Sequence, residues 1–179
     1  IFAGCLTSVT IPSSVKTIGE VAFAYCVSMT NLSIAEGVKF IKTAAFAECF
    51  NLTSITIPNS VTTIGASAFE ECPSVTSITI GTGVTSIGGL AFSGCNAVQT
   101  LNYNANVMTD YTGNADDTSY VFNGIGQDSS TGTCSVVVGD NVTNIPAYLF
   151  YNQIGITSVT IGNGVTKIGA HAFDNNTKM

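Results

Sequence analysis

The sequence contains no arginine and a single histidine, and only 9% of its 179 residues are charged. Five lysines stand against eleven acidic residues, which gives a formal net charge of −6 at pH 7. Nucleic acids and anionic membranes are recognised through clustered basic side chains, so this composition disfavours both as partners. No apolar run approaches the roughly 20 residues that a helix needs to cross a bilayer. We therefore expect neither a nucleic-acid partner nor membrane insertion within this chain.

Motifs of catalysis are also lacking. The sequence has no nucleophile elbow, no glycine-rich phosphate loop after a strand, and no Cys-x-x-Cys or Cys/His metal spacing. The neighbouring carboxylates of Glu70 and Glu71 are interpreted as a solvent-exposed pair. We therefore predict a protein that is not an enzyme and that uses no cofactor or metal.

What the sequence does contain is an internal repeat, because phenylalanine recurs every 23 residues with one interruption. The positions are Phe23, Phe46, Phe69 and Phe92, and then Phe150 and Phe173. A unit of this size cannot bury its own apolar face, so neighbouring units must stack to make a core. The repeat predicts a solenoid. His171 lies where other units carry Ser67 or Tyr148, and we interpret it as a solvated turn residue.

Each repeat unit changes its hydrophobic period along its length. Residues 52–72 read LTSITIPNSVTTIGASAFEEC. The alternation over 54–57, ended by Pro58, predicts a short strand with one buried face. Residues 61–64 predict a second short strand, and the spacing of apolar residues over 65–72 suits one or two helical turns. We expect an α/β solenoid with a parallel β-sheet on one face, and short strands and short helical turns on the other.

Gly65 opens the expected helical turns, and its equivalents in other units are Lys42 and Pro146. Proline cannot adopt a positive φ, so this position needs no left-handed residue and suits the first position of a helix.

The regular spacing fails between residues 104 and 133. Phe92 and Phe150 are 58 residues apart, which is two units plus 12 residues, and Phe122 lies between them in a similar aromatic setting. We predict that residues 1–179 form one solenoid domain whose irregular coil, at about 104–133, carries insertions. The insertions are expected near residues 108–118 and 126–133.

Two parts of the chain are candidates for binding: the polar strand positions, which form two ladders on the sheet face, and the insertions, because loops on a rigid scaffold concentrate binding residues. The candidates are Ser54, Thr56, Ser77, Thr79, Thr100 and Asn102 on the strands, and Tyr103, Tyr111, Asp116, Asp117 and Tyr120 in or beside the insertions. A harmless surface loop is the alternative for the insertions. Calcium binding by their aspartates is disfavoured, because the spacing matches no known calcium loop.

Five cysteines occupy one position of the repeat: Cys5, Cys26, Cys49, Cys72 and Cys95. They should form a ladder with a spacing of roughly 4.8 Å, close enough for some pairs to bridge. Disulfides and a soft-metal stack are the alternatives. We favour buried thiols that act as small hydrophobic groups, because later units carry Gln153 and Asn176 at this position.

The string IPxSVTxIGxxAFxxC, present at residues 57–72 and in weaker form at 11–26, resembles the BspA-like class of leucine-rich repeats. The resemblance covers nearly the whole chain and implies a leucine-rich-repeat solenoid. It also implies an extracellular or cell-surface location, because members are typically secreted or surface-anchored in bacteria and some protists. Some members are adhesins that bind host matrix or plasma glycoproteins.

Three functions follow as hypotheses. The first is a non-catalytic binding module that attaches to a protein or glycan of a host or neighbouring cell through its repeat surface. The second is an inert structural spacer within a larger surface protein. The third, suggested by the rows of serine and threonine, is ice binding.

The first and last residues of the sequence fall inside repeat units, so we expect this chain to be a fragment of a longer array. End coils without polar caps expose the edges of the core, and we therefore expect end-to-end self-association.

Overall fold

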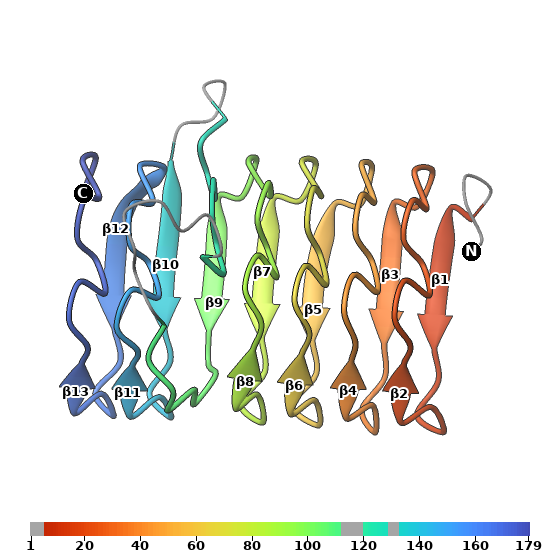
Figure 1. Ribbon diagram of the computed structural model, residues 1–179, viewed down its shortest axis with the longest axis horizontal. Helices are drawn as coiled ribbons and strands as arrows, with labels where there is room; N and C mark the ends of the chain where they lie inside the picture. Colours follow the sequence, from red (N-terminus) through yellow and green to blue (C-terminus); the bar gives the residue numbers. More distant parts are fainter. Residues whose placement is uncertain (1–5, 112–119, 129–132) are drawn as a thin grey trace.

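The computed structural model describes residues 6–111, 120–128 and 133–179. The chain winds into a stack of coils that follow one another in sequence order along the long axis (Figure 1). Each coil contributes one longer strand, and the strand pairs are parallel. These strands are β1 (Ser8–Ile11), β3 (Asn31–Ile34), β5 (Ser54–Ile57), β7 (Ser77–Ile80), β9 (Thr100–Tyr103), β10 (Cys134–Val138) and β12 (Ile156–Ile161).

A second row of two-residue strands runs beside the first (Figure 1). It contains β2 (Thr17–Ile18), β4 (Phe40–Ile41), β6 (Thr63–Ile64), β8 (Ser86–Ile87), β11 (Asn144–Ile145) and β13 (Lys167–Ile168). Strands β2, β4, β6 and β8 form one parallel sheet, and β11 pairs separately with β13. The parallel-sheet solenoid expected from the repeat is therefore confirmed.

The alternating pattern of each longer strand separates core from solvent. In β5, Ile55 and Ile57 are each 1% exposed, whereas Ser54 and Thr56 point outward. The register pairs Ile55 with Ile78 of β7, so the same apolar position stacks on itself from coil to coil. Burial of these like-placed side chains makes one continuous core and removes apolar surface from water.

The expectation of short helical turns is wrong, because no helix occurs in the described ranges. Over 65–72 the N–H groups of Ser67, Phe69 and Glu71 donate to carbonyls of the next coil, 22 residues further along, over 2.8–3.0 Å. The N–H of Glu70, which lies between them, instead closes a turn on the carbonyl of Ser67. A helix would direct every N–H into its own segment. Here alternate groups join neighbouring coils, so the segment is a series of turns.

Residues in the left-handed backbone conformation recur at the same two positions of each series of turns. Ser67 has φ of 54° and Glu71 has φ of 53°, and the equivalent residues of other coils are also left-handed. A left-handed residue interrupts a right-handed helix. Gly65 and Pro146 do not have positive φ, as the sequence predicted. The left-handed position lies two residues later, which the sequence pattern did not indicate.

The repeated phenylalanines form a stacked ladder in the core. Phe69 lies 5.1 Å from Phe46 and 5.5 Å from Phe92 between ring centroids, with the rings within 8° of parallel. Phe122 stacks between Phe92 and Phe150 at 5.4 Å from each. The ladder therefore continues through the irregular coil.

The irregular coil is tied to its neighbours through main-chain and side-chain hydrogen bonds. Leu101 of β9 pairs directly with Val136 of β10, a step of 35 residues and thus 12 more than the regular step. The side-chain oxygen of Asn106 accepts a hydrogen bond from the N–H of Thr143 at 2.9 Å. Asp110 likewise accepts from the N–H of Ala147 at 2.9 Å. These side chains take the place of the main-chain ladder between β8 and β11.

The last coil leaves part of its apolar surface open. Ile161 at the end of β12 is 41% exposed, and Ile168 of β13 is 53% exposed. These are the side chains through which end-to-end association would act, and that association stays a prediction. Within the described ranges, no helix has the length and apolar character needed to span a membrane.

Candidate binding surface

The strand register lines up the outward polar residues in two rows. Ser54 pairs with Ser77 and Thr56 with Thr79, and the rows continue to Thr100 and Asn102 of β9. The first row reaches Ser135 and Ser158, while Val137 interrupts the second. We call the surface formed by Ser54, Thr56, Ser77, Thr79, Thr100 and Asn102 the hydroxyl face.

Several hydroxyl groups of this face are available to a partner. Among the described residues, the side chains of Ser54, Thr56 and Ser77 make no hydrogen bond. Thr79 accepts one from the side-chain amide of Asn102 at 3.3 Å. A hydroxyl that is not engaged within the chain can both donate and accept. The hydroxyl face therefore offers unsatisfied hydrogen-bonding groups at the regular spacing of the strands.

The hydroxyl face leads into a hollow of about 350 Å³ at the carboxyl ends of the strands. The residues that line it are Ile34, Glu36, Thr56, Ile57, Pro58, Asn59, Thr79, Gly81 and Asn104. Two candidates from the sequence, Thr56 and Thr79, thus lie at its wall. The hollow combines apolar side chains with hydroxyl, amide and carboxylate groups, as small-molecule and side-chain pockets do.

Among the described residues that line the hollow, Glu36 is the one carboxylate, and it is held in place by the next coil. Its two side-chain oxygens accept hydrogen bonds from the N–H groups of Asn59 and Ser60 at 3.0 and 2.9 Å. Desolvation opposes the charged form of Glu36, but these backbone hydrogen bonds outweigh it and lower its pKa. Glu36 therefore presents a fixed negative charge near the hydroxyl face at neutral pH.

A separate set of threonines holds the coils together by donating hydrogen bonds within the chain, so their hydroxyl protons are not available to a partner. The hydroxyl of Thr53 donates to the carbonyl of Thr30 at 3.1 Å, and that of Thr76 donates to Thr53 at 3.3 Å. Thr62 and Thr85 make the same contact along the second row of strands, with Lys39 and Thr62 as acceptors. Sequence reasoning missed this role, because these threonines differ from those of the hydroxyl face only in register.

The structure separates the tyrosines and aspartates that the sequence placed in the insertions. Tyr103 is fully buried, with its ring edge-on to Phe122 and Phe150, and Tyr120 is 7% exposed. Their expected place on a binding surface is therefore wrong, because the inward strand position and packing against Tyr151 cover them. Tyr111 is half-buried and donates to the carbonyl of Ile87 at 3.1 Å. Asp116 and Asp117 lie outside the described residues.

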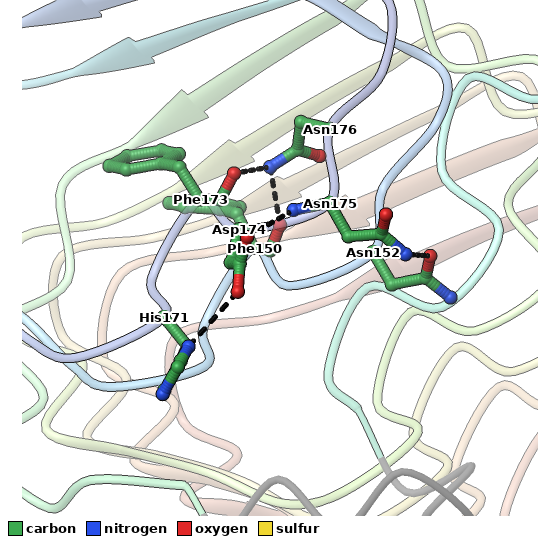
Figure 2. Close-up of polar contacts among 7 residues, drawn as sticks. All are labelled: Phe150, Asn152, His171, Phe173, Asp174, Asn175 and Asn176. Atoms are coloured by element: carbon green, nitrogen blue, oxygen red, sulfur yellow. Dashed lines mark hydrogen bonds and ion pairs between the residues drawn. The ribbon is translucent and has the colours of Figure 1, made fainter.

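The cysteines of the ladder, apart from Cys5, which lies outside the described residues, are fully buried free thiols. Cys49 and Cys72 each donate from Sγ to the carbonyl of a phenylalanine 26 residues earlier, at 3.4 Å. Asn176 makes the equivalent contact in the last coil, where its amide donates to the carbonyl of Phe150 at 2.9 Å (Figure 2). Thiol and amide side chains at this position can therefore both donate to the preceding coil.

We expect the five buried thiols to resist modification until the chain unfolds. Burial raises the pKa of Cys95 and of Cys134 to about 12, so neither forms the reactive thiolate at neutral pH. Titration with a chromogenic thiol reagent should modify none of Cys26, Cys49, Cys72, Cys95 and Cys134 before denaturation, and all six cysteines of the sequence after it. Fewer than six under non-reducing denaturation would contradict this reading.

Among the described residues, no group of three or more His, Cys, Asp or Glu side chains could hold a metal ion. His171 is exposed on the turn face and lies 3.0 Å from the carboxylate of Asp174 (Figure 2).

These features define a parallel β-solenoid with an uncharged polar sheet face. The family model described as the BspA type leucine rich repeat region matches six copies, over residues 1–112 and 120–179. The chain therefore belongs to this family, as its repeated string indicated. A search of the curated proteins finds no match.

Solved structures share the fold at low sequence identity. A leucine-rich repeat protein from Bacteroides ovatus is 23% identical with a TM-score of 0.51, and the match covers 99% of this chain and 67% of that chain. One from Eubacterium ventriosum is 22% identical with a TM-score of 0.66, over 94% of this chain and 42% of that chain. A leucine rich cell surface protein from Faecalibacterium prausnitzii matches at 24% identity and a TM-score of 0.42, over 99% of this chain and 67% of that chain. The first two show the fold alone, and the third superposes too loosely to support a conclusion.

Proposed function

We propose that this chain is a non-catalytic binding module that attaches to a protein or glycan outside the cell through its hydroxyl face. The observation that carries the proposal is the set of unengaged hydroxyls of Ser54, Thr56 and Ser77, of which that of Thr56 lines the 350 Å³ hollow. Such groups bond to water in the free chain and can exchange it for the hydrogen bonds of a partner. The rigid spacing of the coils holds them in place, so little side-chain entropy is lost on binding.

The chemistry of the face supports a partner bound through many weak polar contacts. Serine and threonine provide short side chains, and no lysine lies at the hydroxyl face positions. An extended surface gains strength from multiplying contacts along the repeat, because each further contact is made at high effective concentration. Membership of the BspA type family supports the cell-surface location, since such members are typically secreted or surface-anchored.

Replacing Thr56 and Thr79 with lysine tests the proposal. The two lysines would place positive charge and long side chains across both sides of the hollow, so binding to the partner should fall by at least tenfold. The measurement is binding of the purified chain and the variant to a panel of matrix glycoproteins, plasma proteins and glycans by surface plasmon resonance.

The matched control is Thr63→Lys with Ser86→Lys, which puts the same residues on outward positions of β6 and β8 in the same two coils. Retained binding by this control and loss by the first variant supports the hydroxyl face. Equal binding by the wild type and both variants, or no binding to any member of the panel, favours the inert spacer. Ice binding, the third hypothesis, would show as thermal hysteresis that the Thr56→Lys, Thr79→Lys variant lacks.

A further inference from the structure

The last three coils carry a cluster of aromatic side chains on the turn face, away from the hydroxyl face. Tyr120, Tyr148 and His171 each lie two residues before a phenylalanine of the core ladder, where the earlier coils carry small or aliphatic residues. Tyr151 joins them from the adjacent position. We call these four residues the aromatic strip.

Ring contacts join the aromatic strip into one continuous cluster. The ring of Tyr148 stacks on that of His171 with centroids 4.9 Å apart and 26° between planes. Tyr151 meets Tyr148 at 5.5 Å and Tyr120 at 5.3 Å. Tyr120 is buried beneath the ring of Tyr151. Tyr148 and Tyr151 are themselves half-buried, and the side chain of His171 is 50% exposed.

The backbone fixes the direction of these rings. Tyr148 and His171 have φ of 59° and 55°, in the left-handed region that every regular coil adopts at this position. The N–H of Tyr148 donates to the carbonyl of Ala170 at 3.1 Å, which locks one coil to the next. Tyrosine has few rotatable bonds, so rings presented in this way bind with little loss of entropy.

Polar groups border the aromatic strip on the same turn face. The carboxylate of Asp174 lies 3.0 Å from Nδ1 of His171, and its side chain is 60% exposed. The side-chain amide of Asn175 donates to that of Asn152 at 2.6 Å (Figure 2). Each of these groups has hydrogen-bonding capacity left over, because a carboxylate accepts several hydrogen bonds and an amide both donates and accepts.

We propose that the aromatic strip binds an unbranched neutral oligosaccharide. A pyranose ring has an apolar C–H face, which packs on aromatic rings, and a rim of hydroxyls, which bonds to carboxylates and amides. The accessible rings of Tyr148, Tyr151 and His171 and the polar groups that border them supply both over two successive coils, so they fit a linear chain of sugars. Polyanionic glycans are excluded by the net charge of −6 and the lack of arginine. This site lies apart from the hydroxyl face and does not depend on it.

The experiment is a calorimetric titration of the purified chain with neutral hexasaccharides of β-1,4-linked glucose, mannose and N-acetylglucosamine. Tyrosine fluorescence provides a second readout, because the sequence contains no tryptophan. We expect one of these sugars to bind, and Tyr148→Ser with Tyr151→Glu to weaken that binding at least tenfold. These two substitutions install Ser67 and Glu70, the residues of a regular coil, at the equivalent positions.

A second variant separates a loss of binding from a loss of folding. His171→Ala removes an exposed ring and should weaken binding several-fold with an unchanged circular dichroism spectrum. The controls Ser67→Ala and Thr56→Lys with Thr79→Lys should bind as the wild type does. Absence of binding by every hexasaccharide up to about 10 mM, a free energy of only about −3 kcal/mol, would overturn the proposal. Undiminished binding by the Tyr148, Tyr151 and His171 variants would also overturn it, as would loss in the Thr56, Thr79 variant.

Discussion

Replacing Phe69 with alanine is expected to lower the free energy of unfolding by about 3–5 kcal/mol, because it removes a large buried side chain and leaves a cavity. Phe69 is fully buried and stacks on both Phe46 and Phe92. The neighbouring coils cannot close the gap, since hydrogen bonds between coils fix their spacing. Thermal unfolding followed by circular dichroism should show a fall in Tm of about 6–20 °C.

Phe173→Ala is the matched control for this prediction. Phe173 occupies the same repeat position in the last coil, but it is half-exposed and stacks only on Phe150 among the described rings. In a stack of coils the stability depends on contacts between neighbours, so a residue with one neighbour contributes less than a residue with two. The loss should be less than half that of Phe69→Ala. Equal losses of unfolding free energy in the two variants would mean that stacking of the phenylalanines from coil to coil does not stabilise the fold.

Gly155→Ala carries the second large effect, although it adds only a methyl group. A Cβ at Gly155 would overlap the main chain of Ile125 and Gly126 in the preceding coil. Backbone cannot move aside as a flexible side chain can, and overpacking of this kind costs about 3 kcal/mol. We expect Tm to fall by about 6–12 °C, measured by differential scanning calorimetry.

Gly19→Ala provides the comparison. Its Cβ would meet no atom within 4 Å, and its φ is not positive. Substitution there should leave Tm unchanged or raise it slightly, because alanine lowers the entropy of the unfolded chain. If Gly155→Ala lowered Tm no more than Gly19→Ala does, the close approach of Gly155 to the main chain of Ile125 and Gly126 would be contradicted.

Much of the fold could be predicted from single positions of the repeat. The 23-residue step of Phe46 and Phe69 predicted stacking, and the alternation of Ser54 and Ile55 predicted which side of the strand is buried. Both predictions hold because a repeated local pattern places the same side chain at the same point of each coil. Pro146 correctly indicated that its position is not left-handed.

The predictions that failed concerned segments whose structure depends on contacts with a neighbouring coil. The pattern over 65–72 suited a helix, but alternate N–H groups bond to the next coil, which no periodicity within one unit can reveal. Tyr103 was placed on a surface because it borders the insertion, yet the register with Val138 and Ile80 turns its ring into the core. Gly155 has the equivalents Asn51, Ser74 and Ala97 in regular coils, so the sequence alone suggests that a side chain is tolerated there.

The sequence by itself determined the repeat, the parallel solenoid, the buried phenylalanine and cysteine ladders and the polar rows of the sheet, because each of these follows from which residue recurs at which step. Only the tertiary structure decided which hydroxyls bond within the chain and which remain free, how the irregular coil is tied in through Asn106 and Asp110, and where aromatic rings meet on the turn face. The physical reason is that hydrogen bonds and ring contacts between coils join residues 21 to 37 positions apart, so they depend on the stacking of whole coils.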